Sequence, residues 1–457
     1  MENLKTSEIR HAEKQVAHFL EKYGMHYAGI DLLGQLKLFT AEMVNGLEGR
    51  QSSLKMYPTF IEFNNKIPKN EPVIVLDAGG TNLRSAVFHF DTDKKPVVAK
   101  YRQTLMPGLK NEASKDEFFN TIADSIGDIL NESERIGFVF SYPIEIFPNK
   151  DGRLVRFTKE IKAKEVEGQF IGENLMRVIR NRGFKNIKSI VLLNDTVASL
   201  LSGIASFQDR EFSGYIGLVL GTGMNACYIE SNSNIKAGIL SGLPREGSQL
   251  INIEAGQYLK GPLSKIDEVF DAKTLNPALS TFEKMFSGAY LGGLAHTVLG
   301  FAAADGLFSG KFARDLYNLE SLNSWDLDDY LYFPPENKKL ADLVPGMSEK
   351  DKVVLYYLFD SLVERAAALT SIVLSASAIK EGTGYNPCAP ICIVADGSSF
   401  YKMKNFKSRI EHYLNAILSK HHIKAGAEFA DCPDHIYYEI HAVEEAILKG
   451  AAAAALA

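Results

Sequence analysis

The segment Asp77-Ala-Gly-Gly-Thr-Asn-Leu-Arg84 carries side chains that together fit a phosphate ligand. Its adjacent glycines lack a Cβ, so a ligand can approach the backbone closely, and the exposed N–H groups of such a turn attract anions. The threonine and asparagine add donors, the arginine adds a fixed charge, and the aspartate could hold Mg²⁺ through water. A strained hairpin without a ligand is the alternative. The predicted nucleotide contacts are Asp77, Gly79, Gly80, Thr81, Asn82 and Arg84.

A second glycine-rich turn, Leu220-Gly-Thr-Gly-Met-Asn225, has the same plan of apolar strand, polar turn and second strand. The repeated plan, in Val73–Phe88 and Ile216–Glu230, predicts two related halves that face one ligand, although two such hairpins can also be alike by chance. Gly221 and Thr222 are therefore predicted to hold phosphates.

A carboxylate ends an almost wholly apolar run: Asn194-Asp195 follows Ile190–Leu193. Ligands of α/β proteins bind at the carboxyl ends of such strands, so Asp195 is a candidate functional residue. Aspartate is also a good N-cap, and the residues from Thr196 onward are expected to be helical. Position alone leaves both interpretations open.

Strands and helices alternate along most of the chain, which predicts an α/β architecture. Strands are predicted at Val73–Asp77, Leu83–Phe90, Ile136–Phe140, Ile187–Leu193, Tyr215–Leu220, Ala226–Ile229 and Ile391–Ala395. Helices are predicted at Ser7–Gly46, Glu117–Leu130, Phe170–Ile179, Thr196–Ala205, Thr281–Leu299, Lys352–Ile379 and, from its alanine content, Ala442–Ala457. Gly382-Thr-Gly384 follows one of these helices and is interpreted as its C-cap.

Composition excludes several classes of protein. The 457 residues carry a net charge of −6, and no basic cluster predicts a nucleic-acid partner. No apolar run approaches the ~18 residues of a membrane helix, and Met1–Gln15 lacks a signal core, so no membrane partner and a cytoplasmic location are expected. Cys388 and Cys392 could form a metal or redox pair, but no second pair completes a zinc site. No resident metal is predicted, and the four cysteines are expected to be buried free thiols: Cys227, Cys388, Cys392 and Cys432.

Several segments together resemble the eukaryotic-type hexokinase and glucokinase family. Asp77–Arg84 resembles its motif Asp-x-Gly-Gly-Thr-Asn-x-Arg, and Leu220–Ala226 is similar to its second phosphate motif. The other similar segments are Ser53–Thr59, Phe140–Pro143, Thr158-Lys159, Leu193–Val197, Phe282–Lys284 and Val394–Ser398. They occur in the family's order over nearly the whole chain, whose length fits a single kinase unit.

The resemblance implies a two-lobed, actin-like and ribonuclease-H-like ATPase fold, with a cleft between a small and a large domain. The small domain would comprise residues 66–195, completed by a C-terminal helix at 442–457. The large domain would comprise residues 196–441, with the helical segment 1–65 packed on it. The implied reaction moves the γ-phosphoryl group of ATP, bound as its Mg²⁺ complex, to the 6-hydroxyl of a hexose. Glucose is the expected hexose, mannose and fructose are further candidates, and the reaction would open glycolysis.

The resemblance also assigns roles to individual residues. Asp195 would accept the proton of the 6-hydroxyl, and Lys159 would neutralise charge on the transferred group. A hexose needs donors and acceptors that match its hydroxyls. The residues implied to surround it are Ser141, Thr158, Lys159, Asn194, Asp195, Asn225, Glu254 and Glu283. Asp396, Gly397 and Ser398 would border the adenosine.

Departures from the family pattern concern the sugar loops and the C-terminal segment. Tyr142 replaces the usual phenylalanine and adds a hydroxyl, and Ala255 replaces a tryptophan. Glu445–Gly450 lacks a Gly-Ser pair, so its adenine contacts are not defined. Two rival functions remain: a sugar-responsive regulator of this fold with weak catalysis, and a two-lobed ATPase whose acceptor is water. No feature predicts an oligomeric state.

Overall fold

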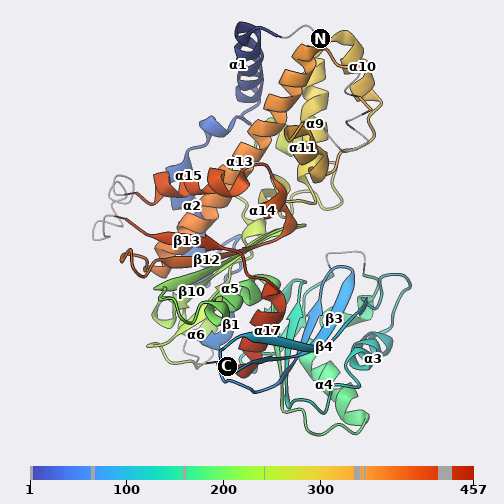
Figure 1. The fold of residues 1–457 in the computed structure, drawn as a ribbon, viewed down its shortest axis with the longest axis vertical. Helices are drawn as coiled ribbons and strands as arrows, with labels where there is room; N and C mark the ends of the chain where they lie inside the picture. Colours follow the sequence, from blue (N-terminus) through green and yellow to red (C-terminus); the bar gives the residue numbers. More distant parts are fainter. Residues whose placement is uncertain are drawn as a thin grey trace.

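The computed structural model describes residues 4–62, 67–157, 161–240, 242–333, 340, 342–343, 346–419 and 435–457. Two larger β-sheets and their surrounding helices form two lobes (Figure 1). Three residues singled out from the sequence, Thr158, Lys159 and Cys432, lie outside the described residues.

The smaller lobe contains a five-stranded sheet of order β4-β3-β2-β5-β8 (Figure 1). Its strands are β2 (Val73–Ala78), β3 (Asn82–Phe90), β4 (Pro96–Leu105), β5 (Arg135–Phe140) and β8 (Ser189–Leu193). β2 pairs antiparallel with β3 and parallel with β5, which pairs parallel with β8. The parallel strands are nearly continuous apolar runs, as is typical of strands covered on both faces.

The larger lobe repeats this arrangement in a six-stranded sheet of order β1-β11-β10-β9-β12-β13. Its strands are β1 (Tyr57–Glu62), β9 (Gly214–Leu220), β10 (Met224–Ser231), β11 (Ser248–Asn252), β12 (Ile391–Asp396) and β13 (Tyr438–His441). β9 pairs antiparallel with β10 and parallel with β12, as β2 does with β3 and β5. The predicted internal repeat is therefore present in the topology. A separate hairpin pairs β6 (Ile144–Ile146) with β7 (Gly152–Leu154).

Two helices lie between the sheets and set how closely the lobes approach. α5 (Asp195–Ser206) packs on β9 and β12, whereas α17 (Ala446–Leu456) packs on α5, β2 and β5 (Figure 1). A Cβ on Gly450 would lie only 2.0 Å from the Ala198 carbonyl oxygen, so glycine is needed where the two helices meet. The alanine-rich end is thus a buried, closely packed helix, as predicted, although it begins at Ala446.

The remaining helices cover the other faces of the sheets or pack on one another, and α1 and α2 contact α13. They are α1 (Thr6–Lys22), α2 (Leu32–Leu47), α3 (Lys115–Ser125), α4 (Ile171–Asn181), α6 (Ala237–Leu240), α7 (Lys265–Asp271), α8 (Thr281–Lys284), α9 (Leu291–Ala304), α10 (Gly310–Tyr317), α11 (Ser324–Leu331), α13 (Glu349–Glu381), α14 (Ser398–Lys402) and α15 (Phe406–Ile417). Short 3₁₀ turns occur at Tyr27–Gly29, Lys164–Val166, Asn232–Asn234 and Ala255–Gln257. The predicted domain boundaries stay a prediction.

Three helix predictions were too long. The single helix predicted from Ser7 to Gly46 is two helices, because Gly24 turns the chain at a φ of 71° and Asp31 caps the next helix. The prediction that began at Thr281 is likewise divided into α8 and α9, and the one that began at Glu117 ends at Ser125. Apolar periodicity continued across these turns, so it did not reveal them.

The length and apolar character of helix α13 were underestimated from the sequence. Among the described residues it is the one helix long and apolar enough by composition to cross a membrane, contrary to the prediction that no such run exists. Of its apolar window, 89% is buried in the fold, where the helix packs on α1, α2, α15 and β10. This packing accounts for its apolar composition. The helix ends at Glu381, and its C-cap is Gly382, whose φ of 70° is left-handed, which confirms the predicted C-cap.

The prediction for the cysteines was correct at two positions and wrong at one. Cys227 and Cys392 are buried free thiols within strands. Cys388 is exposed, because it lies in the turn before β12 rather than in the strand that begins at Ile391.

Candidate active site

The turn between β2 and β3 borders a cavity of about 420 Å³. The Gly79 N–H donates to the Asn82 carbonyl oxygen at 3.0 Å, which closes the turn. The residues that line the cavity are Asp77, Gly79, Gly80, Thr81, Asn82, Arg84, Leu109 and Thr222. Every predicted contact of the first segment therefore faces a space shared with Thr222 of the second glycine-rich turn.

Arg84 is held at the wall of this cavity by its partner on the neighbouring strand. Asp77 and Arg84 are paired in the β2–β3 ladder, and Arg84 Nη1 donates to Asp77 Oδ2 at 3.1 Å. The Asp77 side chain is 7% exposed, whereas that of Arg84 is 42% exposed. The guanidinium is thus oriented by a buried carboxylate and keeps N–H groups for a phosphate.

Two other segments hold the second turn, between β9 and β10. The Gly221 carbonyl oxygen accepts hydrogen bonds from the Gly288 N–H at 2.8 Å and the Ser399 hydroxyl at 3.1 Å. Gly397 has a φ of 108°, and a Cβ there would lie 2.3 Å from the Leu220 carbonyl oxygen, so the position requires glycine. The segment predicted to border adenosine therefore packs directly on the second turn.

Asp396, at the end of β12, immediately precedes Gly397 and interacts with Arg84 of the first segment and with Asp195. It accepts the Gly397 N–H at 2.6 Å. Burial raises the pKa of Asp396, the Gly397 hydrogen bond lowers it, and the charges of Asp195 and Arg84 add smaller effects of opposite sign. Arg84 of β3, Asp195 of α5 and Asp396 of β12 are therefore close enough for their charges to interact.

A second cavity, of about 310 Å³, also includes Thr222 in its wall. It is lined by Gly221, Thr222, Gly288, Ala289, Leu322, Asn323, Ser324, Trp325, Asp328, Ser398, Ser399, Lys402 and Met403. Sequence reasoning found Gly221, Thr222 and Ser398 here and missed Gly288 and Ala289, which precede α9, the residues of and just before α11, and the remainder of α14. Trp325, the single tryptophan of the chain and 59% exposed, was the one available signal.

Asp328 brings an unusual carboxyl group to this second cavity. Its Oδ1 is buried and has no hydrogen-bond partner among the described residues. Burial raises the pKa of Asp328 to about 6, against the lowering effect of a hydrogen bond from the Lys404 N–H. The group therefore changes its charge close to neutral pH.

A chain of hydrogen bonds orients four polar side chains beside the second turn. Asn225 Nδ2 donates to Asn252 Oδ1 at 2.7 Å, and Asn252 Nδ2 donates to Glu254 Oε1 at 2.9 Å. Gln257 Nε2 donates to Glu254 Oε2 at 3.2 Å. Burial raises the pKa of Glu254, the Asn252 hydrogen bond lowers it, and the Asp195 charge raises it further. Glu254 and Asp195 are therefore close enough to interact.

Glu283, on α8, joins this group from a distant part of the chain. Its Oε2 accepts the Met224 N–H at 2.9 Å. A Cβ on Gly223 would lie 2.6 Å from the same oxygen, and a Cβ on Gly256 would lie 3.1 Å from Glu283 Cβ. The structure thus brings together Asn225, Glu254 and Glu283, as the resemblance implied.

The suggestion that Asp195 caps α5 was wrong. The N-cap is Asn194, whose Oδ1 accepts the Thr196 N–H at 2.9 Å. Asp195 is the first helical residue, and its Oδ1 accepts the same N–H at 2.8 Å. A neighbour already performs the capping, so capping does not explain a carboxylate at position 195.

The small-lobe side of the site is described in part. Ser141 follows β5, and its N–H donates to the Ala78 carbonyl oxygen at 3.1 Å, so it lies next to the first turn. Sequence reasoning gave no role to Tyr57 on β1. Burial raises the pKa of Tyr57 to about 12, with smaller effects from Glu254 and Glu145, so its phenol lies near carboxylates of both lobes.

The donor set fits a Mg²⁺–nucleotide complex. Within the residues described, no group of three or more His, Cys, Asp or Glu side chains could hold a metal ion by itself. Asp77, which lines the first cavity, and Asp396, which interacts with Arg84, supply carboxylate oxygens. Magnesium is commonly bound by one or two carboxylates, water and substrate phosphates, and these residues match that pattern.

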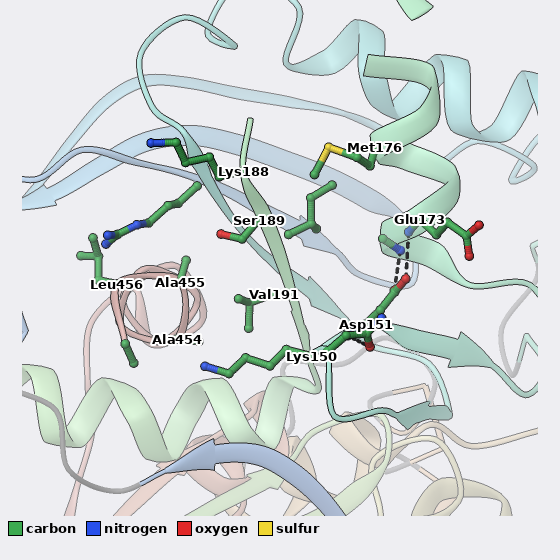
Figure 2. A pocket seen from close by; sticks show the side chains of 15 residues that line it. Lys150, Asp151, Glu173, Met176, Lys188, Ser189, Val191, Ala454, Ala455 and Leu456 are labelled. Carbon is green, nitrogen blue, oxygen red and sulfur yellow. Dashed lines mark hydrogen bonds between the residues drawn. The ribbon is translucent and has the colours of Figure 1, made fainter. Parts of the chain in front are cut away.

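A larger cavity, of about 540 Å³, lies apart from these motifs, between the end of α17, β8 and the start of α4 (Figure 2). Asp151 accepts the Gly172 and Glu173 N–H groups at 2.7 and 2.8 Å, which satisfies the first turn of α4 (Figure 2). None of the described residues that line this cavity belongs to a predicted motif.

Comparison with known proteins gives consistent matches. Two family models, both described as hexokinase, match residues 23–205 and 215–457. Human hexokinase-3 is 29% identical over 388 residues, which are 80% of this chain and 40% of that protein. Human hexokinase-2 is 28% identical over 435 residues, which are 90% of this chain and 46% of that protein. The chain thus spans less than half the length of these relatives.

Solved structures match over nearly the whole chain. A hexokinase from Schistosoma mansoni complexed with glucose has a TM-score of 0.77 and 24% identity, and the match covers 98% of this chain and 99% of that one. A crystal structure of a hexokinase has a TM-score of 0.72 and 21% identity, with 99% of each chain covered. These matches confirm the predicted two-lobed fold.

Proposed function

The chain belongs to the hexokinase family, and from this premise we propose that it transfers the γ-phosphoryl group of ATP to the 6-hydroxyl of a hexose. Glucose is the proposed first substrate, with mannose and fructose as further acceptors. The product, a hexose 6-phosphate, would enter glycolysis. The rival assignments as a regulator or a water-using ATPase are less well supported, because the acid residues suited to hexose hydroxyls are present beside the phosphate turns.

One observation above all supports the proposal: the cavity that both glycine-rich turns line lies next to a group of interacting carboxylates. Thr222 of the second turn faces the same space as the whole first turn. The charge of Asp195 acts on both Asp396 and Glu254. Phosphate donors and hydroxyl acceptors are thus neighbours, as transfer between a nucleotide and a sugar requires.

Positioning and charge neutralisation dominate phosphoryl transfer. The N–H groups of the two turns and the Arg84 guanidinium would hold the phosphates. Mg²⁺ bound to the nucleotide, near Asp77 and Asp396, would supply further positive charge to the phosphate oxygens. The second cavity, beyond Thr222, would hold the adenosine, with Trp325 and Ser398 on its walls.

The proposed acceptor site begins with Asp195, which would take the proton of the 6-hydroxyl as that oxygen attacks phosphorus. Asn225 Nδ2 would donate a hydrogen bond to one sugar hydroxyl, and the Glu254 carboxylate would accept hydrogen bonds from others. Their fixed network reduces the reorganisation needed on binding. Glu283 would contact the sugar from α8, a separate segment of the large lobe. Ser141, Thr158, Lys159 and Asn194 are proposed to complete the site from the small lobe and the start of α5.

A sugar panel tests the proposal. ADP formation and hexose 6-phosphate formation would be followed together, with glucose, mannose, fructose or no sugar present. Equal, sugar-dependent appearance of both products supports a hexokinase. ADP formation without sugar at a similar rate would favour the ATPase, and glucose binding without ADP formation would favour the regulator.

A further inference from the structure

The hydroxyl of Tyr142 connects two segments of the proposed site. One is Phe140–Pro143, the sugar loop, and the other is Ala78–Asn82, the phosphate turn that joins β2 to β3. The hydroxyl donates to the Gly79 carbonyl oxygen at 2.6 Å, and Tyr142 is 1% exposed. One residue earlier, the Ser141 N–H donates to the Ala78 carbonyl oxygen at 3.1 Å. Two consecutive residues of the sugar loop therefore hold two consecutive carbonyls of the phosphate turn.

The Tyr142 side chain has little freedom to leave this position. Its ring centroid lies 5.0 Å from that of Phe140 and 5.0 Å from that of Phe157. Burial, with a smaller effect from the Asp77 charge, raises the pKa of Tyr142, so the hydroxyl stays protonated and remains a donor at neutral pH. At 2.6 Å the hydrogen bond is at the short end of the range for O–H···O contacts.

The hydrogen bond fixes the direction of the next peptide group. In a trans peptide the carbonyl and the following N–H point to opposite sides. A hydroxyl that holds the Gly79 carbonyl toward the sugar loop therefore turns the Gly80 N–H away from that loop. Gly79 and Gly80 both line the 420 Å³ cavity, and glycine peptides rotate easily unless something restrains them.

We propose that Tyr142 is a positioning residue that orients the Gly79–Gly80 peptide for the nucleotide phosphates and thereby couples the sugar loop to the phosphate turn. The inference rests on the proposed kinase function, because it names a residue of that same site. Tyr142 itself contacts neither substrate in this assignment; it acts through the turn.

Tyr142→Phe removes the hydroxyl and keeps the ring. We expect the KM for MgATP and the dissociation constant for MgADP to rise roughly two- to tenfold, the range for one net hydrogen bond. The KM for glucose should stay within about twofold, because the residues that contact the sugar are unchanged. Steady-state kinetics with each substrate varied, and calorimetric titration with MgADP, measure these quantities.

Tyr330→Phe is the matched control. Tyr330 is also 1% exposed and donates its hydroxyl to a backbone carbonyl, that of Lys352, at 3.0 Å, but Lys352, unlike Gly79, lines neither nucleotide cavity. Both variants should unfold at a lower urea concentration than the parent, and Tyr142→Phe alone should lose affinity for the nucleotide.

Three results are decisive. An unchanged MgADP affinity in a destabilised Tyr142→Phe protein would reduce Tyr142 to a structural role and overturn the inference. A rise confined to the KM for glucose would also overturn it, since the hydroxyl would then serve the sugar. If the parent shows no hexose phosphorylation, the proposed function fails, while the MgADP titration still decides whether Tyr142 orients the turn.

Discussion

Asp195→Asn tests the centre of the proposed reaction, because it removes a proton acceptor and changes little else. Asp195 Oδ1 accepts the Thr196 N–H at 2.8 Å, and an asparagine oxygen can accept the same bond. The cap of α5 is Asn194, which the substitution leaves in place. Loss of a negative charge from the first turn should lower the free energy of unfolding by only about 0.3–1 kcal/mol.

The kinetic effect should be much larger. Removal of a general base lowers kcat by roughly 10²–10⁴-fold, which is about 3–5 kcal/mol of activation barrier. A coupled assay at saturating MgATP and glucose measures kcat, and urea unfolding measures stability. Asn194→Ala is the comparison variant: it should lower stability by about 0.5–2 kcal/mol through loss of the cap and keep the base. Because Asn194 is also a proposed sugar contact, its KM for glucose should rise, and kcat at saturating glucose is the quantity compared.

A folded Asp195→Asn protein whose kcat lies within a few-fold of the parent would refute the assignment of Asp195 as the base. An equally severe loss of kcat in Asn194→Ala would show that turnover depends on the geometry of the helix start rather than on the carboxylate. Glucose affinity should fall modestly in Asp195→Asn, since the amide keeps a carbonyl acceptor.

Four further outcomes are expected. Glu254→Gln and Glu283→Gln should each weaken glucose binding by about 1.5–3 kcal/mol with little change for an ATP analogue; titration with each ligand checks this, and a loss confined to the nucleotide contradicts it. MgADP should change the fluorescence of Trp325, the single tryptophan, because it lines the proposed adenosine cavity; an unaltered spectrum at saturation argues against that cavity. Glucose should reduce the radius of gyration in small-angle scattering, since its proposed ligands come from both lobes, and an unchanged radius counts against closure. Asp328→Asn should stabilise the protein relative to the parent near neutral pH but not in acid, because protonated Asp328 favours the fold and this contribution is lost as pH rises through about 6; urea unfolding at the two pH values tests the sign.

Local motifs were sufficient to predict the two glycine-rich turns between strands and the strand that leads to Asp195. The properties of a turn such as Gly79-Gly80 depend on residues within a few positions of it. A continuous apolar run such as Ile190–Leu193 indicates a buried element. The same is true of the Gly382 C-cap, whose left-handed φ follows from the helix that it ends. Resemblance to a family then added roles that no single motif carries.

Other parts of the site became visible only in the folded chain. Asn194, not Asp195, caps α5, which adjacent sequence positions could not distinguish because either side chain can accept the same N–H. Trp325 and Ser398 line one cavity although they come from different helices. The Tyr142 hydroxyl, just after β5, reaches the Gly79 carbonyl, just after the neighbouring strand β2. Such contacts join residues far apart in sequence, and neither helical nor strand periodicity records them, because periodicity reports burial within one element and not which element lies opposite.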